Sequence, residues 1–133
     1  MQLDDQLLRA LHEGSNALPV DLDRLHGYLR LIGVLLAEKA QEHEPAWRQV
    51  LASAAEIETL QDLEALVVEK AIAVRARTLW AVISKLAIWA SLDDGAADGP
   101  EVTQRDRLVD SARRDIERIA RNGDSRLARM GGR

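Results

Sequence analysis

The feature that most constrains this chain is an apolar stripe whose members recur at alternating intervals of three and four residues. The stripe consists of Leu22, Leu25, Leu29, Ile32 and Leu36. This spacing keeps side chains on one face of an α-helix, whereas a half-buried strand would need an interval of two. Asp21 stands just before the stripe, where its carboxylate can accept hydrogen bonds from the first backbone N–H groups. The pattern predicts a capped helix over Asp21–His43. Further apolar residues widen the stripe, so we expect the helix to be largely enclosed; they are Tyr28, Leu31, Val34 and Leu35.

Similar patterns predict four more helical stretches. They are Leu3–Glu13, Pro45–Ala73, Thr78–Leu92 and Pro100–Asn122. Pro45 and Pro100 suit a first helical turn, and Gly14 and Gly123 suit helix ends. The segment Arg75–Thr78 favours a break after the third stretch, with Thr78 capping the next helix. No proline or glycine enforces that break, so a single helix over Pro45–Leu92 remains an alternative. Residues 93–99, which are acidic and rich in Gly and Ala, are expected to form a loop.

The composition supports an all-α fold. The chain has three Trp, one Tyr and no Phe among 133 residues, whereas strands favour aromatic and β-branched side chains. We therefore expect a compact antiparallel bundle of four or five helices formed by residues 1–123, with the three middle helices as its core. Residues 124–133 offer few apolar side chains and are expected to form a flexible tail. The inner face of the last helix is predicted to carry Val102, Val109, Ala112, Ile116 and Ile119.

Several classes of protein are excluded or disfavoured by simple counts. The chain has no Cys, which rules out disulfides, thiolate metal sites and a cysteine nucleophile. It has no run of about 18 apolar residues, so no membrane span is predicted. Its first residues are acidic where a signal peptide would be basic, and we therefore expect a cytoplasmic protein.

Candidate catalytic and metal-binding residues are few. The histidines His12, His26 and His43 lie in separate helical stretches, and no Glu stands three residues before any of them, as a di-iron bundle would require. The pair Asp23 and His26 has that spacing once. Phosphate-loop, dinucleotide and serine-nucleophile motifs do not occur. We predict no catalytic, cofactor or metal site, and keep an enzyme built on Asp23 and His26 as a remote alternative.

Charge is divided unevenly along the chain. Residues 1–100 carry nine basic and sixteen acidic side chains, whereas residues 101–133 carry nine Arg, no Lys and six acids. The expected helix Pro100–Asn122 would carry an arginine stripe opposite its apolar face. Its members are Arg107, Arg114, Arg118 and Arg121, with Arg113 beside them. This stripe would be a solvated face, a surface for an acidic protein, or a contact to nucleic acid. Pairs four residues apart, Asp110 with Arg114 and Glu117 with Arg121, would neutralise part of it.

The stretch Thr78–Leu92 is apolar nearly all round, and Lys85 is its only charge. Such a helix is either buried on several sides or covered by a protein partner. Trp80 and Trp89 stand nine residues apart and so point to opposite sides. One would then be in the core while the other, with Ile83, anchors an interface, although a core role for both is also consistent.

These observations favour a non-enzymatic protein-interaction module that forms a homo-oligomer or binds another protein. The alternative is a small nucleic-acid-binding regulator that uses Arg113, Arg114, Arg118 and Arg121. The acidic net charge of −4 and the lack of aromatic residues between the arginines favour the interaction module.

A local pattern is similar to one found in a group of small, uncharacterised all-helical alphaproteobacterial proteins, often linked to mobile or phage-like gene clusters. The matching residues are Trp47, Ile72, Ala76, Thr78, Lys85, Ser111 and Asp115. The chain departs from that pattern at Arg75, where the group has Pro, and at Val82-Ile83, where it has Gly-Leu. The resemblance implies a bacterial protein with this helical layout and carries no activity with it.

Overall fold

A computed structural model of the chain describes residues 5–40, 47–92 and 103–131. These residues form five α-helices and one short 3-10 helix, η1, and include no strand. The elements are α1 (Asp5–Glu13), η1 (Ser15–Ala17), α2 (Leu22–Ala40), α3 (Trp47–Ala73), α4 (Leu79–Ser91) and α5 (Gln104–Gly131). The predicted all-α class is confirmed.

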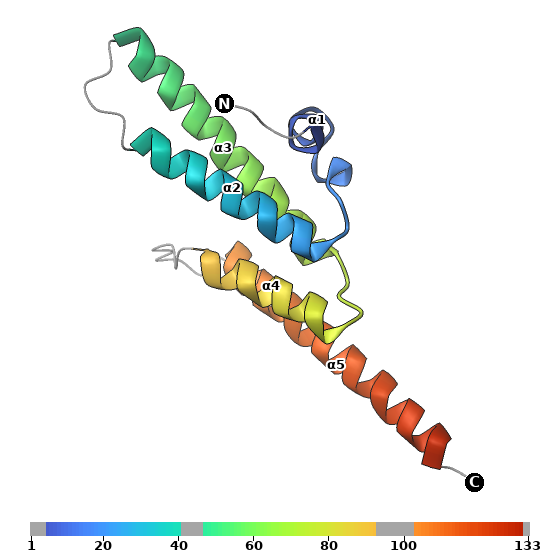
Figure 1. Cartoon of the computed structure of the whole chain (residues 1–133). Helices are drawn as coiled ribbons and strands as arrows, with labels where there is room; N and C mark the ends of the chain where they lie inside the picture. Colours follow the sequence, from blue (N-terminus) through green and yellow to red (C-terminus); the bar gives the residue numbers. More distant parts are fainter. Residues whose placement is uncertain (1–4, 41–46, 93–102, 132–133) are drawn as a thin grey trace.

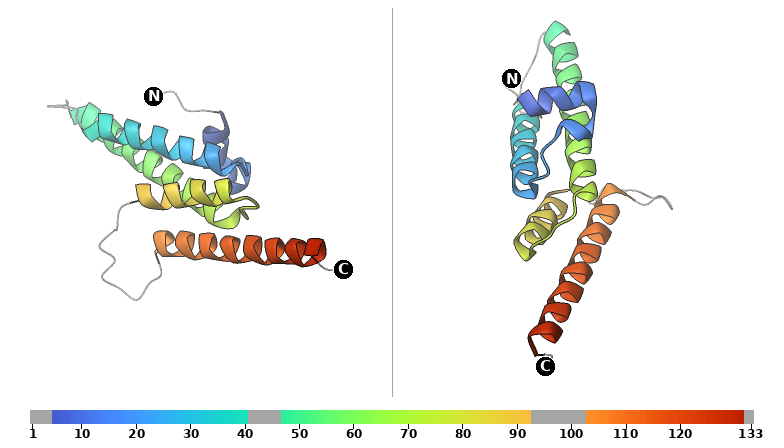
Figure 2. Two further views of the ribbon diagram at one scale, coloured as in Figure 1. Left: turned by 60° about the horizontal axis from the view of Figure 1, so that its bottom comes forward. Right: turned by 90° about the vertical axis from the view of Figure 1, so that its right-hand side faces the viewer.

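Four of the helices form a bundle in which each contacts two neighbours. Helix α2 packs against α3 and α4, and α5 packs against the same two helices from the other side. Figure 1 shows α2 and α3 as one antiparallel hairpin and α4 and α5 as a second. Helix α1 crosses the first hairpin at a steep angle and contacts α3, and the last turns of α5 extend beyond the other helices (Figure 2).

Helix starts follow local capping chemistry. Asp21 Oδ1 accepts hydrogen bonds from the backbone N–H groups of Asp23 and Arg24, at 3.0 and 3.4 Å, as predicted. Thr78 Oγ1 accepts one from the Ala81 N–H at 3.1 Å, and α3 ends at Ala73, so the break near residues 75–78 is also confirmed. These caps satisfy N–H groups that have no partner within their own helix.

A capping box that was not predicted from the sequence sets the start of α5. Thr103 Oγ1 accepts from the Asp106 N–H at 3.1 Å, and Asp106 Oδ2 accepts from the Thr103 N–H at 3.3 Å. The reciprocal pair satisfies two backbone donors and begins the helix at Gln104. The start expected at Pro100 lies outside the described residues, as do Leu3, His43, Pro45 and the loop expected over residues 93–99.

The helix end predicted at Gly123 is wrong, because α5 continues to Gly131. A glycine inside an exposed helix costs only about 1 kcal/mol relative to alanine, and the following residues include good helix formers such as Leu127, Ala128 and Arg129. The flexibility expected for residues 124–133 stays a prediction.

The core is assembled from all five helices. Leu22, Leu25, Leu29 and Ile32 of the predicted α2 stripe are buried, and Leu36 is half-buried against them. Helix α2 is less enclosed than predicted, since Leu31 and Val34 are exposed. The other helices contribute buried side chains that include Leu7, Leu60, Leu63, Val67, Ile88 and Leu108.

The inner face of α5 differs from the prediction. Val109 and Ile116 are exposed, while Leu108 and Asp115 are buried beside Ala112. Val102 lies outside the described residues. The prediction failed because it assumed that no charged residue would point inward, whereas Asp115 occupies an inner position.

Candidate functional site

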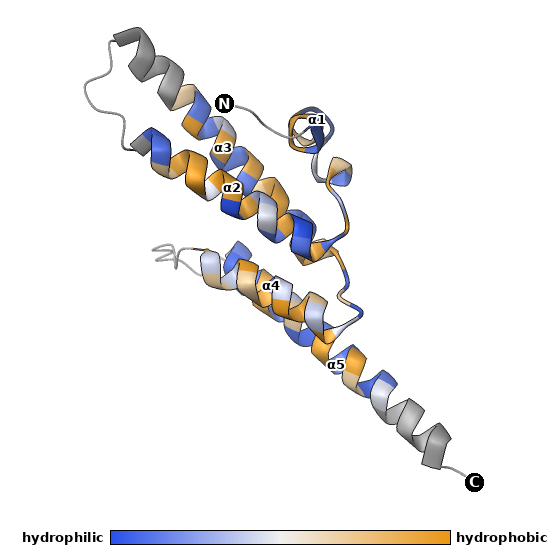
Figure 3. Cartoon of the chain, viewed as in Figure 1, coloured by the Kyte–Doolittle hydropathy of each residue, from blue (hydrophilic) through white to orange (hydrophobic). Residues whose placement is uncertain are grey.

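The side of α4 that points away from the bundle is largely apolar, and Ser84 and Ser91 are the polar residues on it. Leu79, Trp80 and Ile83 are 60, 79 and 52% exposed, Ala90 is exposed and Ala87 is half-buried. These five residues are called the α4 face below. Lys85, the only charge in the helix, points to the opposite side and is fully buried. Figure 3 shows the contrast between the mainly hydrophobic and neutral α4 and the strongly polar turns of α5.

The two tryptophans of α4 lie on different sides of the helix. Trp80 is exposed, whereas Trp89 is half-buried against the core, with the Arg105 guanidinium carbon 4.2 Å from its ring centroid. This arrangement matches the interpretation in which one tryptophan packs inside and the other is available to a partner.

A groove of about 580 Å³ runs beside the α4 face, where the start of α2 meets α4. Trp80 and Ile83 form part of its wall, and Asp23 and His26 of α2 form another part. This is where the structure places the remote catalytic candidates. Within the described residues, no group of three or more His, Asp or Glu side chains is arranged to hold a metal ion.

A polar cluster surrounds the ammonium group of Lys85, which with Asp115 makes up the buried charged residues of the described part of the chain. Its Nζ donates to Asp115 Oδ2 and the Val74 carbonyl, each at 2.6 Å, and to Ser111 Oγ at 2.9 Å. Ser111 Oγ donates in turn to the Ile72 carbonyl at 2.8 Å. The cluster therefore joins α4 and α5 to the end of α3 and the segment that follows it.

Hydrogen bonding in this cluster fits a structural role. An ammonium group has three donors, and Lys85 has three acceptors for them. The Ser111 hydroxyl proton is directed to a main-chain carbonyl instead of a base. Asp115 is 2% exposed, and its second oxygen accepts from Arg118 at 3.1 Å. A buried charge pair is tolerated when its remaining donors and acceptors are satisfied in this way.

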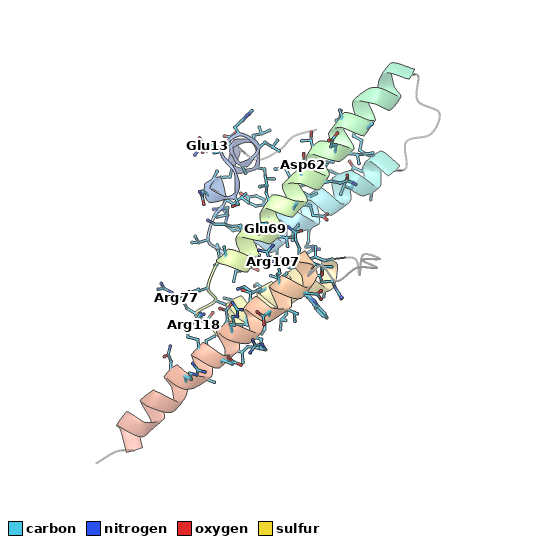
Figure 4. All side chains as sticks on the ribbon, turned by 180° about the vertical axis from the view of Figure 1, so that it is seen from behind. Glu13, Asp62, Glu69, Arg77, Arg107 and Arg118 are labelled. Carbon is cyan, nitrogen blue, oxygen red and sulfur yellow. The ribbon has the colours of Figure 1, made fainter. Side chains whose placement is uncertain are left out.

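The arginines of α5 are largely engaged with acids of their own chain. Arg107 donates two hydrogen bonds, of 2.6 and 3.1 Å, to the carboxylate of Glu69 in α3. Figure 4 labels both residues, which lie next to each other where α5 passes α3. Hydrogen bonding from Arg107 is the main cause that holds the pKa of Glu69 below its ordinary value. This long-range pair is one of the contacts that join α5 to α3.

Ion pairs between residues three or four positions apart follow in the next turns of α5. Arg113 contacts Asp110 at 2.9 Å and Glu117 at 2.6 Å, and Arg114 contacts Asp110 at 2.9 Å. The hydrogen bond from Arg113 lowers the pKa of Asp110, and the same bond raises the pKa of Arg113. The predicted pair of Asp110 with Arg114 is therefore confirmed. Glu117 pairs with Arg113 instead of Arg121, and Arg121 has no ion-pair partner among the described residues.

Sequence reasoning identified the residues of the buried cluster without identifying the cluster. Lys85 stood out as a lone charge in an apolar helix, and Ser111 and Asp115 entered through the resemblance. The pairing could have been predicted in part from helix periodicity, because Lys85 and Asp115 each stand at a position of its helix that faces the core. Two opposite charges that both point into the core need each other as partners. Ser111 and Asp115 stand 26 and 30 residues from Lys85, a separation at which local sequence patterns do not indicate a contact.

Comparison with known proteins finds no relative: no protein family, curated protein or solved structure matches the chain. The resemblance to the alphaproteobacterial group stays a prediction. Nowhere in the described part of the chain is a helix both long and apolar enough to span a membrane.

Proposed function

We propose that this protein is a non-enzymatic interaction module that acts by associating with a second copy of itself through the α4 face. The observation that carries the proposal is the exposure of Trp80, Ile83 and Leu79 on one helix face that has no charged side chain. Contiguous exposed apolar surface is typical of interaction sites, and tryptophan is frequent among residues that dominate binding energy.

The order of side-chain sizes along the α4 face favours a second copy as the partner. Trp80, Ile83, Ala87 and Ala90 follow intervals of three, four and three, which is the spacing of a helix–helix seam. The large side chains stand at the start of the seam and the small ones at its end. In an antiparallel pair, Trp80 would meet the partner's Ala90 and Ile83 would meet the partner's Ala87.

This arrangement is self-complementary. Each large side chain faces a small one, as dense packing requires, and a two-fold axis repeats the contact. A parallel pair would instead place Trp80 on Trp80 and Ala90 on Ala90, which would separate the helices at one end and leave a void at the other. We therefore infer an antiparallel dimer.

The nucleic-acid alternative receives less support from the contacts of the arginine stripe. Arg107, Arg113, Arg114 and Arg118 each have a carboxylate partner in the same chain. A phosphate backbone would have to compete with those carboxylates.

Light scattering on the purified protein at low salt tests the proposal. We expect a particle of twice the 14.8 kDa chain mass, without the ultraviolet absorbance of bound nucleic acid. Ile83→Asp should give a monomer, because a charge would be buried in the seam. Val34→Asp is the matched control, since Val34 is 56% exposed on α2, and it should remain dimeric. A monomeric wild-type protein, or dissociation by both variants alike, would contradict the proposal.

A further inference from the structure

A second feature of the surface lies away from the α4 face, where the segment between α3 and α4 passes over α5. A cleft of about 330 Å³ is present there, within the size range of small-molecule sites. Three guanidinium groups and one carboxamide contribute to its lining, together with two apolar side chains. The lining residues are Arg75, Ala76, Arg77, Arg118, Ile119 and Asn122. Figure 4 shows Arg77 and Arg118 as neighbours on these two segments.

The two apolar residues of the cleft lining pack into the hydrophobic core. Ala76 is 1% exposed and belongs to the hydrophobic core, and Ile119 packs against that core. The segment after α3 is held in place because the Val74 carbonyl accepts a hydrogen bond from Lys85. The arginines are therefore attached to a backbone that the buried cluster fixes.

Positive charge at the cleft is poorly balanced. Arg75 and Arg77 are exposed and have no hydrogen-bond or ion-pair partner among the described residues. Arg118 donates to Asp115, but that carboxylate is already bound by Lys85. Among the residues whose side chains the structure describes, none that lines the cleft is acidic. Three arginines thus line the cleft, and the carboxylate that Arg118 binds is shared with Lys85, in a chain whose net charge is −4.

We propose that this cleft binds a small phosphate-bearing ligand, such as a phosphate monoester or diphosphate. Guanidinium groups pair with phosphate through two parallel hydrogen bonds, and arginine is favoured where planar recognition of this kind is needed. Arg75 and Arg77 approach from one segment and Arg118 from another, which suits a tetrahedral group with several oxygens. A single carboxylate has two oxygens and would pair with only one of these guanidinium groups.

Isothermal titration calorimetry at constant ionic strength tests this inference, with inorganic phosphate and diphosphate as probes and citrate as the carboxylate comparison. We expect saturable binding of diphosphate that Arg77→Gln weakens by about tenfold or more, because a hydrogen-bonded charge contact is lost. Arg75→Gln should have a similar effect. Both side chains are exposed, so the variants should fold normally.

Arg30→Gln is the matched control, because it removes an exposed arginine from α2, away from the cleft. It should leave the affinity for diphosphate unchanged. Absence of saturable binding, tighter binding of citrate than of diphosphate, or an equal loss with Arg30→Gln would overturn the inference. Because neither Arg75 nor Arg77 belongs to the α4 face, the result is independent of the proposed dimer.

Discussion

At the scale of single residues, Lys85 and Asp115 form an ion pair whose side chains are 0 and 2% exposed. Both side chains are removed from water, which is costly for each charge taken alone. The cost is offset by mutual attraction at 2.6 Å and by the other acceptors around Lys85. Since those acceptors come from different segments, the pair also selects one packing arrangement of α4 on α5.

Removal of one partner should therefore be much more damaging than removal of both. Lys85→Met leaves Asp115 buried with only Arg118, and we expect the free energy of unfolding to fall by about 3–5 kcal/mol. The double variant Lys85→Met/Asp115→Leu should recover a large part of that loss. Urea denaturation followed by circular dichroism measures each value.

Arg114→Met is the control for this comparison. Arg114 pairs with Asp110 at 2.9 Å, and the two side chains are 68 and 41% exposed, so its replacement should change the free energy of unfolding only slightly. If Lys85→Met lowered the free energy of unfolding by no more than Arg114→Met, the buried cluster would not have the role assigned to it.

The Glu69–Arg107 pair predicts a dependence of stability on pH. The folded-state pKa of Glu69 lies below its ordinary value of 4.5, so the ionised form is favoured by folding. The stabilisation is fully present above pH 4.5 and is lost as the pH falls through the folded-state pKa. Both side chains are over one-third exposed, and solvent screening limits the effect to less than about 1 kcal/mol.

Glu69→Gln should accordingly lower the free energy of unfolding at pH 7 and leave it nearly unchanged at strongly acidic pH. Denaturation of the variant and wild type at both pH values measures the difference. Glu58→Gln, at an exposed position of the same helix, should show no such pH-dependent gap. If the difference in free energy of unfolding between Glu69→Gln and wild type persisted or grew at acidic pH, the stabilising role given to the ionised Glu69 would be contradicted.

At the scale of elements, capping residues and apolar spacing explain most of what could be predicted from the sequence. The α2 stripe, the Asp21 cap and the break before Thr78 each depend on neighbouring residues, and each is confirmed. The predictions for α5 failed for different reasons. Gly123 was too weak a signal to end the helix, and the inner position of Asp115 depends on Lys85, a long-range partner that periodicity does not reveal.

Two glycines should respond in opposite ways to the same substitution. Gly27 lies exposed within α2, and an added Cβ atom would meet nothing within 4 Å, so Gly27→Ala should raise the free energy of unfolding by about 0.5–1 kcal/mol. Gly14 has a φ of 88° and a ψ of −171°, which alanine adopts only with strain. Gly14→Ala should lower the free energy of unfolding by about 1–3 kcal/mol.

Thermal or urea unfolding of the two variants measures these effects, and each serves as the control for the other. If both variants changed the free energy of unfolding in the same direction, either α2 would not be helical around Gly27 or the turn after α1 would not need its positive φ.

At the scale of the whole molecule, the bundle buries one face of α4 and leaves the other unpartnered. The sequence was sufficient to identify α4 as too apolar for a simple surface helix and to place Trp80 and Trp89 on opposite sides. It was not sufficient to decide which tryptophan faces outward, because that depends on how α2 and α5 pack around α4. The basic cleft beside Arg77 was not predicted either, since it forms only when the segment after α3 meets α5.

The antiparallel seam makes a geometric prediction that suits this chain, which has no native cysteine. In the proposed dimer, residue 83 of one copy faces residue 87 of the other. A mixture of Ile83→Cys and Ala87→Cys proteins should form an intermolecular disulfide, whereas each variant alone should not, because identical positions are offset along the seam.

The most direct measurement is therefore the extent of disulfide cross-linking, on a non-reducing gel, in the mixed sample and in each single variant under mild oxidation. We predict rapid cross-linking in the mixture and little in either variant alone. No covalent dimer in the mixture, or equal rates in all three samples, would contradict an antiparallel association through the α4 face.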